Sequence, residues 1–415
     1  MSERWLILAD DLTGAADCAI AFARRGLGAV VTWGEAGGCA ERSSVLSYDA
    51  DSRGMCAEAA ARRHAQALDR HLGSDRMLFK KMDSTLRGQP ASEMAAAIAC
   101  LKARSGSAFG VFAPAFPATG RTTVEGRVLV GGRPLEEAEV WRRDHTYANA
   151  DLVAVLASAG VPAQKIPLPV VRGHVLRSAL AEIAARGEVV AVCDAETEDD
   201  LARIAAASLP AAPETFFIGS AGLAYALAQA GACRTVALPR IAPSRCGTLI
   251  VVGSLAAVSR AAARKLAASG AVITISVAPE TLLDDRADRS TLATQVIERL
   301  AAGSDVLVEI AMTNEPDLSL GARLAGGLAD TLVQVVPQIG ALAATGGETA
   351  AALLARFGVN GIRLIDEVEP GVSLGLTLGR LSVPVATKAG AFGNADSLLR
   401  ITQRLRKVRS EGSFA

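Results

Sequence analysis

The chain has 415 residues, of which half are hydrophobic and only 4% aromatic. This length exceeds what one ordinary hydrophobic core supports, so two domains are expected. Basic and acidic residues number 43 each, which excludes a global electrostatic attraction to nucleic acid or to an anionic membrane. The composition therefore favours a protein that acts on a small molecule, with no nucleic acid and no membrane as partner.

Seven cysteines are scattered along the chain without a Cys-x-x-Cys pair. This spacing predicts buried thiols in a reducing compartment, not a disulfide framework or a zinc site. The N-terminus lacks a signal-peptide pattern, because its short apolar run leads directly into Asp10 and Asp11. The uncharged stretch 215–233 is interrupted by glycines and favours a strand and a helix over a membrane span. A cytoplasmic location is expected.

The first predicted strand covers residues 5–9 and ends at Asp10 and Asp11. Thr13 is the expected N-cap of the following helix, which closes near residue 26. Two carboxylates at the carboxyl end of a buried strand are costly unless they bind a cation or a hydroxylated ligand. The alternative is that Asp11 is only a capping acid and Asp17 a surface residue.

Two further strands are expected at 29–33 and 44–48, and the second leads into Asp51, Ser52 and Arg53. A helix follows at 55–72. Its two histidines, His64 and His71, have no carboxylate or third ligand at metal spacing, so we expect solvated or capping side chains.

A dense polar cluster follows a short strand that begins at residue 77. It contains Lys80, Lys81, Asp83, Ser84, Thr85 and Arg87. An arginine can fork onto a carboxylate while an aspartate and hydroxyls bind sugar hydroxyls, so the set suits a polyol carboxylate. The alternative is a helix-capping turn with a surface salt bridge. Pro90 is expected to open the next helix.

After a strand at 108–113, Arg121 again lies beside hydroxyls, at Thr122 and Thr123. A hairpin is expected at 128–135. Helical periodicity covers 151–160, 171–186 and 196–208, with a buried strand at 189–193 and another from residue 216. The proline-containing stretch 236–245 is the best linker candidate. The predicted domains are 1–238 and 246–415.

The second half repeats the strand-to-helix pattern with strands at 248–252, 272–277, 306–310, 340–345 and 384–388. Glycine-rich turns follow three of them, at Gly253-Ser254, Gly346-Gly347 and Gly390. Glycines let backbone N–H groups approach phosphates, and a helix N-terminus favours negative charge. Three such turns in one domain indicate a nucleotide site.

Taken together, these clusters resemble the four-carbon acid sugar kinase family, whose members phosphorylate tetronates with ATP. The matching motifs run in the family's order: Ala9 to Gly14, Asp51 to Arg53, Lys80 to Gly88, Ala113 to Pro117, Gly120 to Thr123, Gly219 to Leu223, Gly253-Ser254, Thr345 to Thr349 and Lys388 to Gly393. The resemblance implies two α/β domains with an interdomain active-site cleft, where 1–238 binds the acid sugar and 246–415 binds the nucleotide.

Site residues follow from this resemblance and from the cluster chemistry. The expected acid-sugar residues are Asp10, Asp11, Arg53, Lys81, Asp83, Ser84, Thr85, Arg87 and Arg121. The expected ATP residues are Ser254, Gly346, Gly347, Glu348, Thr349 and Gly390. Asp10 or Asp11 would orient the terminal hydroxyl, the other acid or Asp83 would help to place Mg²⁺, and Arg53 and Arg87 would clamp the carboxylate.

Two departures from the family pattern are Leu255-Ala256-Ala257 in place of Ser and Pro after Ser254, and Tyr48-Asp49-Ala50 before Arg53. Either could tune the substrate. The expected reaction is transfer to the 4-hydroxyl of D-threonate or D-erythronate, with a 3-oxo-tetronate or another small hydroxy acid as the alternative.

Other classes are less consistent with the sequence. A Walker-type ATPase is excluded by the absence of a Gly-Lys dipeptide. An aspartyl-phosphate phosphatase would need different spacing around Asp10. A cytoplasmic small-acid sensor without catalysis stays open, as do the tetronate stereoisomer, the metal ligands and a possible homo-oligomer.

Overall fold

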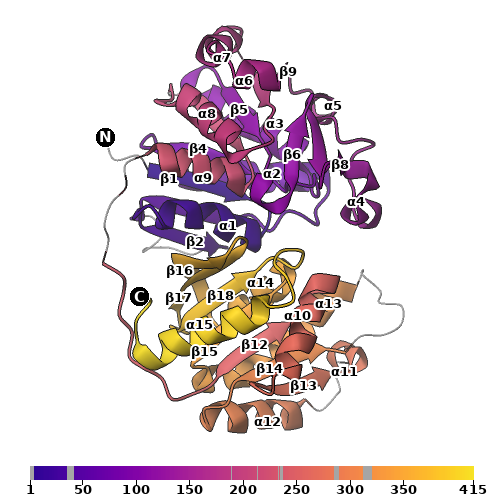
Figure 1. Ribbon diagram of the computed structural model, residues 1–415, viewed down its shortest axis with the longest axis vertical. Coiled ribbons are helices and arrows are strands. Elements are labelled where there is room, and N and C mark those ends of the chain that lie inside the picture. The colour runs from indigo at the N-terminus through magenta and orange to yellow at the C-terminus, as the bar shows by residue number, and fades with distance from the viewer. Residues whose placement is uncertain are drawn as a thin grey trace. The chain divides into compact units, whose positions relative to one another are not determined.

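The computed structural model describes residues 4–34, 42–187, 189–212, 214–231, 233, 237–284, 289–311 and 320–415. The chain forms two compact units, Met1–Thr235 and Val236–Ala415. Each unit is a sheet with helices on both of its faces (Figure 1). Cys39 and Val236, the first residue of the predicted linker, lie outside the described residues.

The main sheet of the first unit is parallel, with strand order β2-β3-β1-β4-β11-β5-β10-β9. The strands are β1 Arg4–Ala9, β2 Ala29–Trp33, β3 Val45–Asp49, β4 Arg76–Lys81, β5 Phe109–Ala113, β9 Ala163–Ile166, β10 Val190–Cys193 and β11 Thr215–Gly219. Most of their residues are buried, as expected for a parallel sheet that is covered on both faces. The carboxyl ends of β1, β3, β4 and β11 consequently meet at one edge.

Helices of the first unit form two layers. In one layer, α9 (Ala221–Ala230) packs against α1 (Leu12–Ala23) and α8 (Glu198–Ser208); in the other, α2 (Ala57–His71) packs against α3 (Pro90–Ser105). Right-handed crossovers place these layers on opposite faces of the sheet. The shorter helices are α4 Glu139–Arg143, α5 Leu152–Ala157, α6 Leu168–Val171 and α7 Leu176–Ala184, and a small antiparallel sheet contains β6 Arg121–Val124, β7 Arg127–Val130 and β8 Arg133–Pro134.

In the second unit the strand order is β13-β14-β12-β15-β18-β17-β16. The strands are β12 Thr248–Val252, β13 Ile273–Val277, β14 Val306–Ile310, β15 Ala341–Thr345, β16 Val359–Glu369, β17 Val372–Gly379 and β18 Pro384–Lys388. Pairing is parallel from β13 to β18, and β17 and β16 add an antiparallel hairpin. The carboxyl ends of β12, β14, β15 and β18 therefore share one edge.

Helices α10 (Ala257–Ala268) and α15 (Ser397–Glu411) pack together over one face of this sheet (Figure 1). Their contact is apolar and includes Leu266, Leu398 and Leu405, all of which are fully buried. The remaining helices are α11 Pro279–Leu283, α12 Ser290–Ala301, α13 Gly321–Leu332 and α14 Gly347–Arg356. Right-handed crossovers through α13 place it and its neighbour α14 on the opposite face.

Several local predictions need correction. The predicted helix 171–186 is two helices, α6 and α7, separated by residues 172–175. Strand β9 and the β16–β17 hairpin were not predicted. His64 and His71 were expected to be solvated or capping, yet both are buried, because the face of α2 that carries them also carries Ala60, Ala67 and Leu68 and turns inward.

Within the described residues, no helix is both long enough and apolar enough to cross a bilayer. The six cysteines among them are free thiols. Most of the uncharged stretch 215–233 forms β11, which ends at Gly219, and α9, which ends at Ala230, as the sequence predicted.

Close packing between α9 and the segment after β5 gives a stability prediction. A Cβ atom at Gly222 would lie 2.3 Å from the carbonyl oxygen of Ala115, so Gly222→Ala is expected to lower the free energy of unfolding by about 1–3 kcal/mol. Gly326→Ala is the control, because Gly326 lies within a helix with no neighbouring atom within 4 Å of the added Cβ. It should stabilise by roughly 0.5–1 kcal/mol. Urea unfolding measures both, and equal effects would contradict the packing argument.

Candidate functional site

The junction between β1 and α1 holds two adjacent aspartates, a buried Asp10 and a partly buried Asp11. Asp10 follows the last residue of β1, and Asp11 is the N-cap of α1. The Asp11 carboxylate accepts hydrogen bonds from the Gly14 N–H at 2.9 Å and from the Thr13 hydroxyl at 2.8 Å. The predicted N-cap, Thr13, is therefore wrong by two residues, since an aspartate caps at least as well and lies directly at the end of the strand.

Arg53 joins these two carboxylates. Its Nε and Nη2 atoms donate to Asp10 at 2.8 and 2.9 Å, and its Nη1 and Nη2 atoms donate to Asp11 at 2.8 and 2.9 Å. Arg53 follows β3, the neighbour of β1 in the sheet. The parallel pairing of these strands therefore brings together charges that lie more than forty residues apart in the sequence.

The loop after β4 supplies a second carboxylate–guanidinium pair. Arg87 Nε and Nη2 donate to Asp83 at 2.7 and 3.1 Å, and the Thr85 hydroxyl donates to the same carboxylate at 2.6 Å. Leu86 and Gly88 both have positive φ angles, 62° and 77°. This tight loop lies near the first pair, because a Cβ atom at Gly88 would be 3.1 Å from Asp10 Oδ2.

The charges of the two pairs interact. Burial alone would raise the pKa of Asp83, but Arg87, Arg53 and Lys81 outweigh it and hold that pKa well below its ordinary value. Burial also raises the pKa of Asp11, but Arg53 and Lys81 outweigh it, so the net result is a lowered pKa. Both carboxylates are therefore firmly ionised at neutral pH and suit accepting hydrogen bonds better than abstracting protons.

Three more predicted residues lie at this edge. Lys81 ends β4, and its Nζ donates to the carbonyl of Met82 at 2.7 Å. Ser84 is buried within the 83–88 loop. Arg121 interacts electrostatically with Asp83 and Arg87, and burial lowers its pKa. The structure thus brings together every acid-sugar residue that the sequence predicted; their roles stay predictions.

The arginines expected to clamp a substrate carboxylate are already hydrogen-bonded to aspartates. Three aspartates and the cations Arg53, Lys81 and Arg87 nearly balance each other's charge. A substrate carboxylate would therefore share or replace these contacts, and its hydroxyls would find ionised acceptors already oriented by the arginines. We call this group the Asp–Arg cluster: Asp10, Asp11, Arg53, Lys81, Asp83 and Arg87.

A magnesium ion fits this site only as part of a complex with phosphates. Among the described residues, no group of three or more His, Cys, Asp or Glu side chains could hold a metal ion. Mg²⁺ commonly uses one or two carboxylates together with substrate phosphates and water. Asp10, Asp11 or Asp83 could supply such a ligand, but each would have to loosen its bond to an arginine.

The three glycine-rich turns of the second unit also come together. A Cβ atom at Gly253 would lie 1.9 Å from Thr349 Oγ1, and one at Gly390 would lie 2.4 Å from Ser254 Oγ. Gly346 has φ +90° and its N–H donates to the carbonyl of Lys388 at 2.9 Å. Only glycine permits these approaches, so the turns form one backbone-lined surface at the N-terminus of α14.

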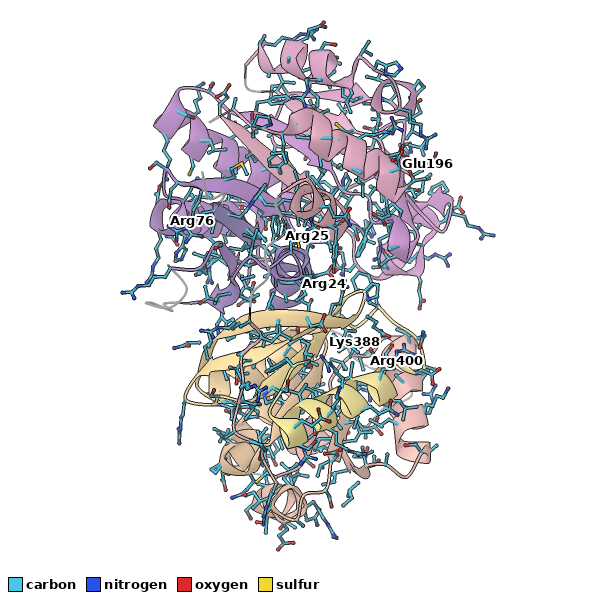
Figure 2. All side chains as sticks on the ribbon, turned by 60° about the vertical axis from the view of Figure 1, so that its left-hand side comes forward. Arg24, Arg25, Arg76, Glu196, Lys388 and Arg400 are labelled. Atoms are coloured by element: carbon cyan, nitrogen blue, oxygen red, sulfur yellow. The ribbon has the colours of Figure 1, made fainter. Side chains whose placement is uncertain are left out.

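A buried lysine holds one of these turns through hydrogen bonds to its backbone carbonyl groups. Lys388 Nζ donates to Ser259 Oγ at 3.0 Å and to the carbonyl oxygens of Ala389 and Gly390 at 3.2 and 3.4 Å. Figure 2 shows Lys388 near Arg400 in the second unit; Arg400 is paired with Glu369, which also interacts with Lys388. Burial lowers the pKa of Lys388 to about 8 despite Glu369. Glu348, in contrast, is exposed on the first turn of α14.

Sequence reasoning missed two residues at these edges. Asp49 ends β3 and is buried; burial, reinforced by Asp11, raises its pKa well above the ordinary value. Its position at the carboxyl end of a predicted strand, like that of Asp10, could have indicated a site residue. Lys388 begins one of the matching motifs but was not predicted as a site residue, although a lysine that ends an apolar strand must find buried acceptors.

The structure thus has two α/β units, one with the Asp–Arg cluster and one with a glycine-lined surface. The family models agree: residues 5–227 match the Sugar-binding N-terminal domain, and residues 249–398 match the Nucleotide-binding C-terminal domain. The chain belongs to the four-carbon acid sugar kinase family. This confirms the resemblance inferred from the motifs.

Relatives named as kinases are similar along nearly the full length. D-threonate kinase of Cupriavidus necator is 41% identical, covering 98% of this chain and 99% of the relative. D-erythronate kinase of Heliobacterium modesticaldum is 31% identical, covering 94% of each. The crystal structure of Haemophilus influenzae protein HI1011 has TM-score 0.72 and 20% identity, covering 99% of this chain and 100% of that one, and so shows the fold alone.

The lowered pKa of Asp83 predicts a pH-dependent effect of Arg87→Gln. Stability from the depressed pKa is present above the ordinary aspartate value and is lost as the pH falls below it toward the folded-state pKa. The variant should therefore be less stable than the parent near pH 7, and the difference should shrink below about pH 4. Urea unfolding between pH 3 and 7 measures it.

Arg203→Gln is the matched control, because Arg203 also pairs with an aspartate four residues away, Asp199, but on the solvent-exposed face of α8. Solvent screens that pair, so its effect should be small at every pH. A constant difference for Arg87→Gln across the range would contradict the electrostatic origin.

Proposed function

We propose that this chain is an ATP-dependent kinase that phosphorylates the terminal 4-hydroxyl of a four-carbon acid sugar, with D-threonate as the first candidate and D-erythronate as the second. The observation that carries the proposal is the Asp–Arg cluster, in which ionised hydroxyl acceptors lie beside guanidinium groups. Near full-length similarity to a D-threonate kinase supports the choice of substrate.

The chemistry asks for positioning more than for a strong base. Phosphoryl transfer passes through a loose transition state, in which the attacking hydroxyl loses its proton late. An aspartate with a lowered pKa orients a hydroxyl by accepting its hydrogen bond, and this suits Asp11, whose carboxylate is held by Arg53, Thr13 and Gly14. Asp10 or Asp83 would take a second hydroxyl.

The substrate carboxylate would bind to the donors that the aspartates leave accessible. Arg87 uses its Nε and Nη2 for Asp83, so its Nη1 edge suits a carboxylate. Lys81 and Arg121 would add positive charge. Ser84 and Thr85 would bind sugar hydroxyls.

ATP would bind to the glycine-lined surface of the second unit, with phosphates against backbone N–H groups of the turns at Gly347 and Gly390 and beside Gly346, whose own N–H is bonded to Lys388. Ser254 and Thr349 would add hydroxyl contacts, and Glu348 could reach the nucleotide from the first turn of α14. Mg²⁺ would neutralise the phosphates when bound. Transfer in a cleft between the domains, a cytoplasmic location and a homo-oligomeric state stay predictions.

The activity prediction is ADP formation from MgATP with one acid of a panel of D- and L-threonate, D- and L-erythronate and 3-oxo-tetronates. A fast, magnesium-dependent reaction with a threonate or erythronate is expected, and assays without an acid give the background. Preferential turnover of a 3-oxo acid would replace the substrate within the same family. Tight acid binding without ADP formation would instead indicate a sensor.

Replacement of the hydroxyl-orienting acids gives a second prediction. Asp10→Asn and Asp11→Asn should each lower kcat by about a hundredfold or more, because a neutral amide accepts the hydroxyl's hydrogen bond more weakly than a carboxylate and orients the attacking oxygen less well. Asparagine still caps a helix, so α1 should be retained. ATP binding, measured by calorimetry, should be unchanged. Full activity in both variants would contradict the assignment.

The nucleotide assignment predicts a selective effect of Gly390→Ala. The added Cβ would lie 2.4 Å from Ser254 Oγ and would displace the Ser254 hydroxyl, an expected ATP contact. We expect the KM for ATP to rise by roughly tenfold, with little change in the KM for the acid. Gly326→Ala, in α13 of the same unit, is the control. An unchanged KM for ATP would argue against binding at this surface.

A further inference from the structure

Four buried polar side chains form a hydrogen-bonded network, and two of them are sequence neighbours of residues in the Asp–Arg cluster. They come from four different elements: Ser52 after β3, His64 on α2, Lys80 on β4 and Glu93 on α3. Each is at most 1% exposed. The established family and the proposed reaction do not account for such a group in the interior of the first unit.

The network is centred on the Glu93 carboxylate. Lys80 Nζ lies 2.8 Å from Glu93 Oε2, and the Ser52 hydroxyl donates to Glu93 Oε1 at 2.8 Å. His64 Nε2 lies 3.0 Å from Ser52 Oγ and 3.3 Å from Glu93 Oε1. Buried charges are costly unless they are paired and hydrogen-bonded, and here each polar group of Ser52, Lys80 and Glu93 has such a partner.

The hydrogen-bond pattern fixes the form of His64. Because the Ser52 hydroxyl donates to Glu93, His64 Nε2 must be the donor to its two oxygen neighbours. His64 Nδ1 is buried without a hydrogen-bond partner, so a proton there would be unsatisfied. Burial, with Lys80 second, also lowers the pKa of His64. The ring is therefore neutral, with its proton on Nε2.

Two members of the network are followed in sequence by members of the Asp–Arg cluster. Ser52 precedes Arg53, and the N–H groups of both donate to the carbonyl oxygen of Asp10 at 3.0 and 3.2 Å. Lys80 precedes Lys81 and donates from Nζ to its carbonyl oxygen. Asp51, the residue before Ser52, has a φ of 49°. This conformation costs energy for any residue except glycine, so the surrounding structure must hold it in place.

We propose that the network Ser52, His64, Glu93 and Lys80 is a positioning device that holds the Arg53 backbone, and through it the guanidinium, in place for acid-sugar binding. Its effect on substrate affinity rests on the proposed function, and its effect on the Arg53 backbone rests on the hydrogen bonds described above. None of the four side chains contacts substrate; each acts through Arg53 or Lys81.

The test uses Ser52 and His64, because a substitution of Glu93 would leave Lys80 as an unpaired charge in the core. Ser52→Ala and His64→Leu each remove hydrogen bonds from the network. His64→Gln is the rescue variant, since the glutamine amide nitrogen can place a donor near the position of Nε2. His71→Leu is the matched control, because His71 is buried on the same helix and packs against Tyr48 with the rings tilted and their centroids 4.7 Å apart.

We expect Ser52→Ala and His64→Leu to raise the KM for the acid sugar by about fivefold, the scale of one lost hydrogen bond, without changing the KM for ATP. His64→Gln should restore most of the affinity. His71→Leu should lower Tm while leaving the KM for the acid unchanged. A loss of Tm with an unchanged acid KM in Ser52→Ala and His64→Leu would overturn the proposal.

Amide hydrogen exchange provides a readout that does not depend on kinase activity. The amides of Ser52 and Arg53 should exchange faster in Ser52→Ala and His64→Leu than in the parent or in His71→Leu, whereas the amide of Gly346, bonded to Lys388 in the other unit, should be unchanged. If no acid is phosphorylated by the parent protein, the proposed function fails, yet faster exchange at these two amides still supports the positioning role. Unchanged exchange there would contradict it.

Discussion

The guanidinium of Arg53 lies between the carboxylates of Asp10 and Asp11, and four hydrogen bonds join the three side chains. The candidate site depends on this contact, because two adjacent carboxylates with little solvent would otherwise repel each other or take up protons. The arginine keeps them ionised and fixes their direction. A hydroxylated ligand then meets acceptors that are already oriented, which lowers the entropy lost on binding.

The same constraint explains why so much of the neighbouring interior is polar. Arg53 can reach Asp10 and Asp11 only if the chain after β3 bends back over the end of β1, and that bend includes a residue with positive φ. Ser52, directly beside the bend, is bonded to Glu93 and His64. A buried ion pair such as Lys80–Glu93 is weak evidence for stability, because an apolar substitute often stabilises as well. Its presence fits the proposed role in specifying one backbone geometry at the site.

The second unit differs from the first in using glycine-rich turns where the first uses charged side chains. Phosphates carry several negative charges, and backbone N–H groups can approach them only where side chains are missing. Gly253, Gly346 and Gly390 clear that space, and Lys388 holds the carbonyl groups of the last turn from behind. The first unit thus presents side-chain charges and the second a glycine-lined backbone, which fits the small carboxylate and the polyphosphate of the proposed function.

The sequence by itself determined the alternation of strands and helices, the positions of most strands and the polar residues that follow them, since these depend on local periodicity, glycine and capping preferences. It also carried enough motifs to identify the family. Only the tertiary structure decided that Arg53 pairs with Asp10 and Asp11, that Arg87 pairs with Asp83, and that His64 faces inward. Those contacts depend on which strands are neighbours in the sheet and on how α2 is rotated against it, and a single sequence does not encode such long-range pairings in any local pattern.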